Sequence, residues 1–430
     1  MSATPPEVAA HEPIMELDPE AIACPYPHFA RMREESPIHH VPELGFAMVT
    51  RYKDVLEIAR KPEVFSSRMP TGPAMMKSMM EGLMEAVQQS PDLMEVMSKS
   101  PIAAPQPVLL MADPPLHTRQ RGLVARAFAP KRVAGMDDGI RDIAEALVDE
   151  FIDDGHVELV TQFGVKLPLI VIADALGVPR DELPTFKLWS DDFVVAIGNH
   201  KLSTERLVQM MKSQAAFADY FREKIAERRA EPRDDLISDI VHARLDDGEE
   251  LSEEEMLGMF SQFLVAGNET TTKMLASGMR LLIDHPDQLE LVRSDSSLLP
   301  ALVDEVLRME SPVQGLFRTA NVDTEIGGVA IEAGTHLMLV YASGNRDEAV
   351  FEDADRFDVT RANSKVHLAF GQGPHFCIGA ALARAEGRIG FEVLLRRLSN
   401  IRYAEGNTFE YEESYVLHGL KELHLEFDKA

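Results

Sequence analysis

The sequence predicts a mainly α-helical fold with small β-sheets, built as one domain over residues 1–430. Long stretches carry apolar residues at helical spacing, whereas β-like patterns are concentrated around residues 319–341. No internal repeat and no flexible Gly/Ser-rich or charged linker divides the chain. With 45% apolar and 27% charged residues, the composition is that of a soluble globular protein large enough to bury a substantial core.

The N-terminal residues 1–15 are expected to form a disordered tail, because they are polar, acidic and rich in proline. Nothing in this region resembles a signal peptide. No run of the sequence approaches the ~18 apolar residues that a membrane helix needs. We therefore expect a cytoplasmic protein without a membrane anchor.

Charge and cysteine content exclude several classes of function. The net charge of −28 repels nucleic acid and anionic membranes, so neither is an expected partner. Solubility is the simplest reason for this acidity. The two cysteines, Cys24 and Cys377, are too few for a disulfide framework, a four-cysteine zinc site or an iron–sulfur cluster.

The first half of the chain mixes short and long elements. Phe46–Thr50 fits a short strand. Residues 69–111 hold nine of the 22 methionines between several prolines, a pattern that fits a mobile apolar lid or ordinary helical core packing. Long helical patterns follow at about 137–153, 182–198 and 203–230.

The clearest helix begins at the capping box Ser252–Glu255 and continues to about Asp284, where Pro286 ends it. Its length of more than 30 residues is unusual for a globular protein. We therefore expect this helix to cross the whole molecule.

Three further elements complete the pattern. A helix over about 298–310 is stopped by Pro312. Residues 326–331 and 336–341, with a turn at Ala333-Gly334 between them, predict a hairpin. A last helix is expected over about 378–398.

The segment Phe370–Gly379, FGQGPHFCIG, carries the strongest chemical signal. Gly371 and Gly373 permit tight turns, and the loop leads directly into the last helix. A cysteine just before a helix N-terminus meets free N–H groups and the positive end of the helix dipole, and both favour the thiolate. Cys377 is therefore the candidate metal ligand. A dinucleotide-binding loop is rejected, because the third glycine of that motif is missing.

This segment resembles the signature of the cytochrome P450 family, Phe-Gly-x-Gly-x-His-x-Cys-x-Gly, at every fixed position. The resemblance implies a fold in which haem b lies between the long central helix and the helix after the cysteine loop. It also implies that Cys377 binds the haem iron and that no flavin is bound. Of this segment, Phe370, Gly371, His375 and Gly379 are then expected to contact the haem.

The middle of the long helix, Ala266-Gly267-Asn268-Glu269-Thr270, is a poor helix sequence because of its glycine and the run of Thr residues that follows. The hydroxyl of Thr270 is expected to bond the carbonyl of Ala266 and open the helix locally. The pattern is similar to the acid–alcohol pair of the P450 family. The resemblance implies that Glu269 and Thr270 deliver protons, with Ala266 and Gly267 beside the haem.

Two charged groups also match the family. His117 and Arg121 lie four residues apart, on one helix face suited to an anion. By resemblance they bind the haem propionates, together with Arg318 and His375. Glu305 and Arg308 resemble the family's Glu-x-x-Arg pair, and Arg356 is expected to be the later arginine that joins them in a structural, non-catalytic role.

The resemblance implies a monooxygenase that uses O₂ and electrons from a separate ferredoxin and its reductase, since no residues remain for a reductase domain. We expect a monomer. Rival functions are a peroxide-driven haem peroxygenase and a haem-based ligand sensor.

The residues expected to line the substrate pocket are the 69–111 segment, Phe263–Val265 and Val313–Phe317. They are mostly apolar and predict a mid-sized hydrophobic substrate, terpenoid or steroid first and fatty acid second.

Six basic residues are expected either to form a docking surface for the electron donor or to be ordinary solvated charges: Arg119, Arg126, Lys131, Arg132, Arg384 and Arg388.

Overall fold

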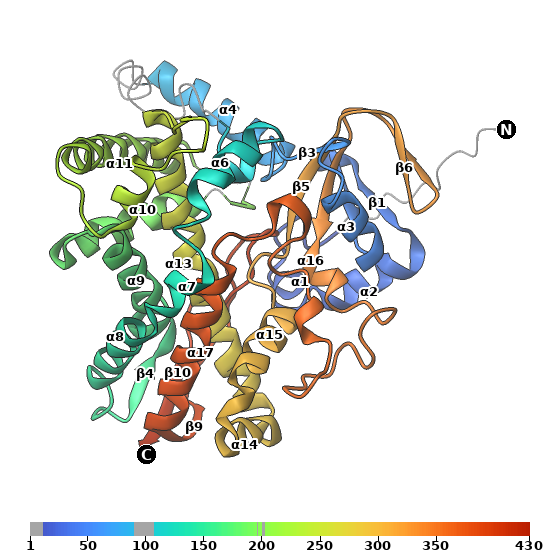
Figure 1. Cartoon of the computed structure of the whole chain (residues 1–430). Coiled ribbons are helices and arrows are strands. Elements are labelled where there is room, and N and C mark those ends of the chain that lie inside the picture. Colours follow the sequence, from blue (N-terminus) through green and yellow to red (C-terminus); the bar gives the residue numbers. More distant parts are fainter. Residues whose placement is uncertain (1–11, 90–106, 196, 200–202) are drawn as a thin grey trace.

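The computed structural model describes residues 12–89, 107–195, 197–199 and 203–430. Figure 1 shows a helical part and a part rich in strands, with helix α13 passing between them. The helices are α1 Pro19–Ala23, α2 Tyr26–Glu35, α3 Tyr52–Ala59, α4 Pro73–Gln89, α6 Leu116–Val124, α7 Pro130–Ala134, α8 Asp137–Asp149, α9 Lys166–Leu176, α10 Leu183–Val194, α11 Thr204–Ala230, α12 Leu236–Val241, α13 Glu253–Asp284, α14 Pro286–Ser294, α15 Leu299–Met309, α16 Tyr341–Gly344 and α17 Ala380–Arg397.

The strands form three small sheets with the orders β1-β2-β8-β5-β3, β4-β10-β9 and β6-β7. Their bounds are β1 Ile38–Val41, β2 Phe46–Val49, β3 Phe65–Ser66, β4 His156–Glu158, β5 Gly315–Ala320, β6 Thr324–Ile326, β7 Val329–Ile331, β8 His336–Val340, β9 Leu398–Tyr403 and β10 His424–Lys429. The predicted class, mainly α with small sheets, is therefore confirmed.

The predicted hairpin over 326–341 is wrong. Gly327 and Gly328 both have positive φ, 59° and 85°, and form the turn of a different hairpin, β6-β7. Strand β8 instead lies in the five-stranded sheet, antiparallel to β5 and parallel to β2. Two adjacent glycines are a stronger turn signal than Ala333-Gly334, because both central residues of such a turn need positive φ.

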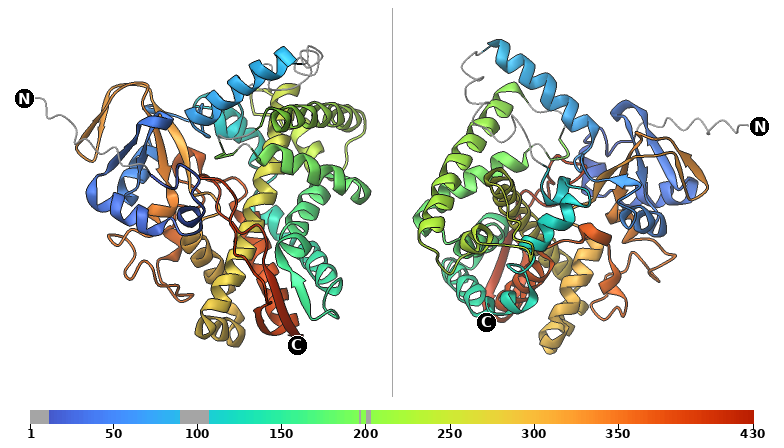
Figure 2. Two further views of the ribbon diagram at one scale, coloured as in Figure 1. Left: turned by 180° about the vertical axis from the view of Figure 1, so that it is seen from behind. Right: turned by 45° about the horizontal axis from the view of Figure 1, so that its top comes forward.

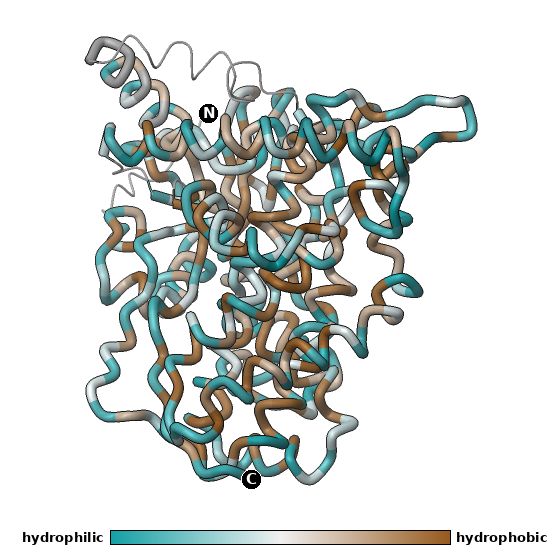
Figure 3. The backbone as a smooth tube through the Cα atoms, turned by 90° about the vertical axis from the view of Figure 1, so that its left-hand side faces the viewer, coloured by the Kyte–Doolittle hydropathy of each residue, from teal (hydrophilic) through white to brown (hydrophobic). Residues whose placement is uncertain are grey.

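The long helix α13 has the predicted bounds and capping box: the Ser252 hydroxyl accepts from the Glu255 N–H, and the Glu255 carboxylate accepts from the Ser252 N–H. Seen from behind in Figure 2, α13 runs down the centre of the molecule. Figure 3 shows hydrophobic segments gathered in the interior and hydrophilic ones mostly at the periphery. Within the described residues, no helix is both long and apolar enough to cross a membrane.

The prediction of a disordered tail is wrong for residues 12–15; residues 1–11 lie outside the described part. Ile14 is fully buried. Glu12 is buried as well, and its carboxylate lies 2.8 Å from His39 and 2.7 Å from Arg31. The polar composition of this region concealed two buried apolar side chains, Ile14 and Met15, and one acid with two specific partners.

The Glu305–Arg308 pair is fully buried, but the arginine that joins it is Arg361 and not Arg356. Arg308 donates to both carboxylate oxygens of Glu305 at 2.8 Å, and the Arg361 Nε lies 3.1 Å from Glu305. The Arg356 guanidinium is largely exposed and is 3.9 Å from Asp358. Only the Arg356 carbonyl takes part in the cluster, as an acceptor from Arg308 and Arg361.

A second buried cluster joins the C-terminal loop to the core. Glu310 lies 2.9 Å from His418, 3.1 Å from Arg280 and 3.8 Å from Arg346. Burial alone raises the pKa of Glu310, but His418, Arg280 and Arg346 outweigh it and lower the pKa to about 2. The cluster ties together α13, the end of α15, the segment after α16 and the loop after β9.

Replacing Arg361 by Ala is expected to cost about 3–5 kcal/mol of unfolding free energy, because it removes a partner of a buried carboxylate. The matched variant Arg356→Ala removes an exposed side chain that lies five residues earlier, and is expected to stay within ~0.5 kcal/mol of wild type. Urea unfolding followed by helical circular dichroism measures both. Equal losses in the two variants would contradict the assignment of Arg361.

The ionised Glu310 stabilises the fold at pH values above its unfolded pKa of 4.5, and this contribution disappears as the pH falls toward about 2. Glu310→Gln is therefore expected to lose about 3 kcal/mol at pH 7 and progressively less below pH 4.5. Urea unfolding between pH 7 and pH 3 checks this. Glu410→Gln, which removes an exposed carboxylate 3.6 Å from Lys421, is the control; a pH-independent difference for Glu310→Gln would refute the argument.

Candidate functional site

Cys377 lies in a tight loop that the local sequence dictates. The Cys377 N–H donates to the Phe370 carbonyl at 2.8 Å. Gly371 and Gly373 have φ of 66° and 70°, a region that favours glycine. A Cβ on Gly373 would also overlap the carbonyl of Ala59. The loop therefore needs both glycines, and α17 begins three residues after the cysteine.

The Cys377 thiol has opposing electrostatic influences. Burial raises its pKa, while the Gly379 N–H and the cations of Arg121 and Arg384 act to lower it. The sequence argument considered only the helix terminus and predicted a thiolate, but burial has the larger effect. A bound metal cation provides the additional positive charge that deprotonates such a thiol.

Four cationic or hydrogen-bonding side chains meet beside this loop. The rings of His117 and His375 are 4.1 Å apart, and both groups experience the charges of Arg121 and Arg318. His117 and Arg318 are buried, and the Nδ1 of His117 has no hydrogen-bond partner within the described residues. Neither guanidinium is ion-paired to a carboxylate in the part of the chain that the structure describes.

This cluster therefore has an excess of positive charge and donors. Burial, followed by the charge of Arg318, lowers the pKa of His375 to about 3. Burial, followed by the charge of Arg121, lowers that of His117. Both imidazoles are then neutral and the two guanidinium groups remain charged. Such a set is complementary to a group with carboxylates, and Arg121 connects it electrostatically to Cys377.

Helix α13 contributes an open face. Ala266 is exposed although α13 passes through the middle of the molecule, so this face borders a space instead of packed side chains. As predicted, the Thr270 hydroxyl donates to the Ala266 carbonyl, at 2.9 Å. A Cβ added to Gly267 would lie 3.9 Å from the Ile172 side chain, an ordinary van der Waals contact.

Glu269 and Thr270 are adjacent in sequence, but the structure shows no hydrogen bond between their side chains. The Glu269 carboxylate instead lies 2.8 Å from Lys273, one turn later on α13, and Lys273 also lies 3.1 Å from Glu412. The sequence analysis missed both residues. The i, i+4 spacing of Glu269 and Lys273 was a usable signal, whereas nothing local points to Glu412.

Taken together, the site offers one thiol for iron, two charged guanidinium groups with two imidazoles for carboxylates, and an open helix face. These features suit a flat iron-containing macrocycle that carries carboxylates. The unpartnered Nδ1 of the buried His117 and the unpaired Arg121 and Arg318 are the observations that fit haem best.

Comparisons with known proteins agree with this fit. The family model for cytochrome P450 matches residues 195–407. The steroid C26-monooxygenase of Mycobacterium tuberculosis (strain CDC 1551) is 36% identical over 361 residues, which cover 83% of this chain and 88% of that protein. The linalool 8-monooxygenase of Pseudomonas putida is 34% identical over 416 residues, covering 95% of this chain and 97% of that one.

The fold agrees as well. The structure of CYP109E1 from Bacillus megaterium in complex with corticosterone matches with a TM-score of 0.81 and 31% identity, over 95% of this chain and 99% of that one. The similarity thus spans nearly the whole molecule and includes the cysteine loop. The chain belongs to the cytochrome P450 family and is a haem b-binding monooxygenase.

Proposed function

We propose that this monooxygenase hydroxylates a mid-sized hydrophobic substrate, with steroids and terpenoids as the first candidates and fatty acids as the second. Relatives at 34–36% identity are named for a steroid and for linalool, and a related structure contains corticosterone. In this chain, the carrying observation is the apolar character of two segments expected beside the substrate: Phe263–Val265 of α13 and Val313–Phe317 before Arg318.

Haem supplies the oxygen-activating chemistry when it is bound. In our proposal, Cys377 is the iron ligand, and His117, Arg121, Arg318 and His375 hold the haem carboxylates. The other residues proposed to border the haem are small or apolar and lie in the cysteine loop and on α13: Phe370, Gly371, Gly379, Ala266 and Gly267.

Glu269 and Thr270 are proposed to deliver protons during oxygen activation. The Thr270 hydroxyl is hydrogen-bonded to the Ala266 carbonyl and so lies beside the open face. Glu269 is the residue that precedes Thr270 on α13. The bond from Thr270 to the Ala266 carbonyl leaves the hydroxyl oxygen able to accept a further hydrogen bond, for example from a water. These two residues are not needed for a peroxide-driven peroxygenase, which makes that alternative less favourable.

The electron donor is proposed to be a ferredoxin that docks near α7. Four of the six expected basic residues are already neutralised by acids of the chain: Arg119 by Glu255, Arg132 by Asp239, Arg384 by Asp304 and Arg388 by Asp137. Arg126 and Lys131 have no ion pair within the described residues. The dock is therefore smaller than the sequence suggested.

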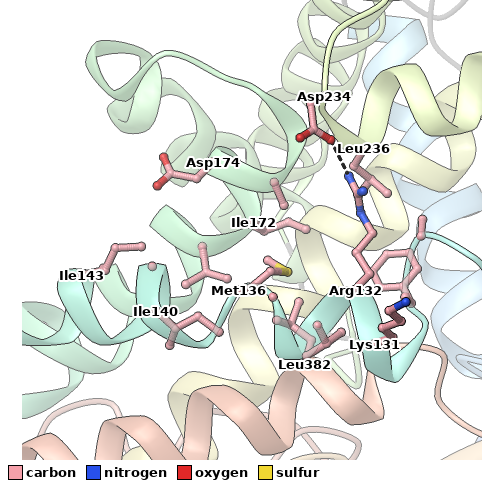
Figure 4. A pocket seen from close by; sticks show the side chains of 17 residues that line it. Lys131, Arg132, Met136, Ile140, Ile143, Ile172, Asp174, Asp234, Leu236 and Leu382 are labelled. Atoms are coloured by element: carbon pink, nitrogen blue, oxygen red, sulfur yellow. Dashed lines mark ion pairs between the residues drawn. The ribbon is translucent and has the colours of Figure 1, made fainter.

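A pocket of about 500 Å³ lies beside Lys131 and is lined by apolar side chains that include Met136, Ile140 and Leu382. In Figure 4, Arg132 reaches over this pocket to Asp234. We propose that an apolar side chain of the ferredoxin enters this pocket, while acidic residues around it pair with Arg126 and Lys131.

The function is tested by optical titration of the ferric protein with steroids, terpenoids and fatty acids. A Soret blue shift with a steroid or terpenoid is expected, since substrate binding displaces water from the iron; a response to fatty acids alone would overturn the first choice.

Cys377→Ser is expected to lose the reduced carbonyl band typical of thiolate ligation. Retention of that band would reject Cys377 as ligand, and turnover faster with peroxide than with ferredoxin would favour a peroxygenase.

The docking proposal predicts that replacing Arg126 and Lys131 together by Glu weakens ferredoxin affinity by roughly 10-fold or more at low salt, because like charges at an interface cost up to several kcal/mol. The wild-type affinity is expected to fall steeply with added salt. The control Lys77→Glu changes an exposed cation of α4, a helix that lies at the top of Figure 1, away from α7. Equal weakening by all variants would argue against this docking surface.

A further inference from the structure

Lys273 is a buried cation in the middle of α13, held between two carboxylates. Its side chain is 2% exposed, and its ammonium lies 2.8 Å from Glu269 and 3.1 Å from Glu412. Burial alone lowers the pKa of Lys273, but the charges of Glu269 and Glu412 outweigh it and raise the pKa. Removing a partner from such a buried group is expensive, so the three side chains depend on one another.

The packing around Lys273 is specific to this arrangement. Gly419 faces the aliphatic part of Lys273, and a Cβ added there would overlap the Lys273 Cγ. The Glu412 N–H donates to the Gly419 carbonyl at 3.1 Å, which places both residues in one closed loop. The loop at 412–419 therefore holds Lys273 by a charge on one side and by close contact on the other.

The same loop is hydrogen-bonded to the segment after Pro312, part of which is proposed to border the substrate. The Gln314 N–H donates to the Val416 carbonyl at 2.7 Å, and the His418 N–H donates to the Pro312 carbonyl at 2.9 Å. Together with the hydrogen bond between His418 and Glu310, these bonds fix the loop to the core. A continuous set of contacts thus connects the proposed substrate side of the site with Glu269.

Other charged groups near Glu269 come from α10. Burial raises the pKa of Asp191; Lys187 opposes this effect, and the charge of Glu269 adds to it. Asp192, the next residue, is buried and paired with Arg206. Glu269 thus experiences the like charge of Asp191, which is unfavourable. Lys273 is the cation that directly compensates the charge of Glu269. Glu269 is largely buried and Asp191 is partly exposed, so without Lys273 the repulsion between these two carboxylates favours uptake of a proton by the pair.

We propose that Lys273 is a positioning residue, which compensates the charge of Glu269 and holds its carboxylate away from Thr270, and that Glu412 in the C-terminal loop sets the strength of this hold. The inference rests on the proposed role of Glu269 in proton delivery. Glu412 is partly exposed, so this carboxylate connects the buried pair with the solvent. Movement of the loop when substrate enters beside Val313 then changes how readily Glu269 exchanges a proton.

The first test is infrared difference spectroscopy of the purified holoenzyme and needs no turnover. Lys273→Met is expected to show at pH 7 the carbonyl stretch of a protonated carboxylic acid that wild type lacks. This band is expected to disappear in the double variant Lys273→Met/Glu269→Gln, which separates Glu269 from Asp191. A Lys273→Met spectrum identical to wild type, or a band that survives in the double variant, would overturn the proposal.

Two milder variants protect the test against misfolding. Glu412→Gln keeps the shape of the partner but removes its charge, and Gly419→Ala moves Lys273 without changing any charge. Gly419→Ala is expected to produce the band seen in Lys273→Met at lower intensity. Glu412→Gln is expected to produce no band, because Lys273 then compensates Glu269 alone. The matched controls are Glu410→Gln, two residues before this loop, and Gly139→Ala, where an added Cβ meets nothing within 4 Å. A band in the controls equal to that in Gly419→Ala would contradict the inference.

The second test is the peroxide released per oxygen consumed, with electrons from a surrogate ferredoxin, as a function of pH. Lys273→Met is expected to displace the pH profile of wild type, and Thr270→Ala to raise peroxide release at every pH. If the infrared band responds to Lys273 but neither variant changes peroxide release, Lys273 still holds Glu269 while the proposed proton delivery fails. If Thr270→Ala responds and the infrared band does not, only the present inference fails.

Discussion

The buried carboxylate of Glu305 is the constraint on which the core beside the cysteine loop depends. It is completely removed from water and is compensated by Arg308 on the same helix and by Arg361 from a distant segment. A carboxylate in such surroundings is tolerated only with paired and hydrogen-bonded cations. Since Arg308 and Arg361 also donate to carbonyls of residues 345–356, the single charge of Glu305 organises the irregular chain that leads to Phe370 and Cys377.

Features encoded by neighbouring residues could be predicted from the sequence. The capping box at Ser252, the back-bond of Thr270 and the glycine-rich turn before Cys377 each depend on a few adjacent positions. Features that depend on distant segments could not. Arg356 and Arg361 are equivalent candidates in the sequence, and only the path of the chain after Phe351 decides which guanidinium reaches Glu305. The partner of β8 and the contact of Lys273 with Glu412 are of the same non-local kind.

The site also shows how a strongly acidic protein maintains a local positive field. The net charge of the chain is −28, yet Arg121 and Arg318 lack ion pairs within the described residues. Burial keeps His117 and His375 neutral, which prevents four like charges from accumulating. The excess is thus limited to two cations, a number that matches the two carboxylates of haem b. Electrostatic balance at this point belongs to the complex and not to the polypeptide alone.

The close approach of Gly419 to Lys273 has a consequence for how this protein and its descendants diverge. A side chain at position 419 and a long side chain at position 273 exclude each other sterically, so neither position can drift independently. Substitution of the lysine by a shorter residue removes the steric restriction on the glycine, and a side chain then acquired at position 419 would clash with a lysine restored at position 273. Related sequences are therefore expected to covary at the two positions. A lysine at position 273 should occur with glycine at position 419, whereas a shorter residue at position 273 permits a side chain at position 419.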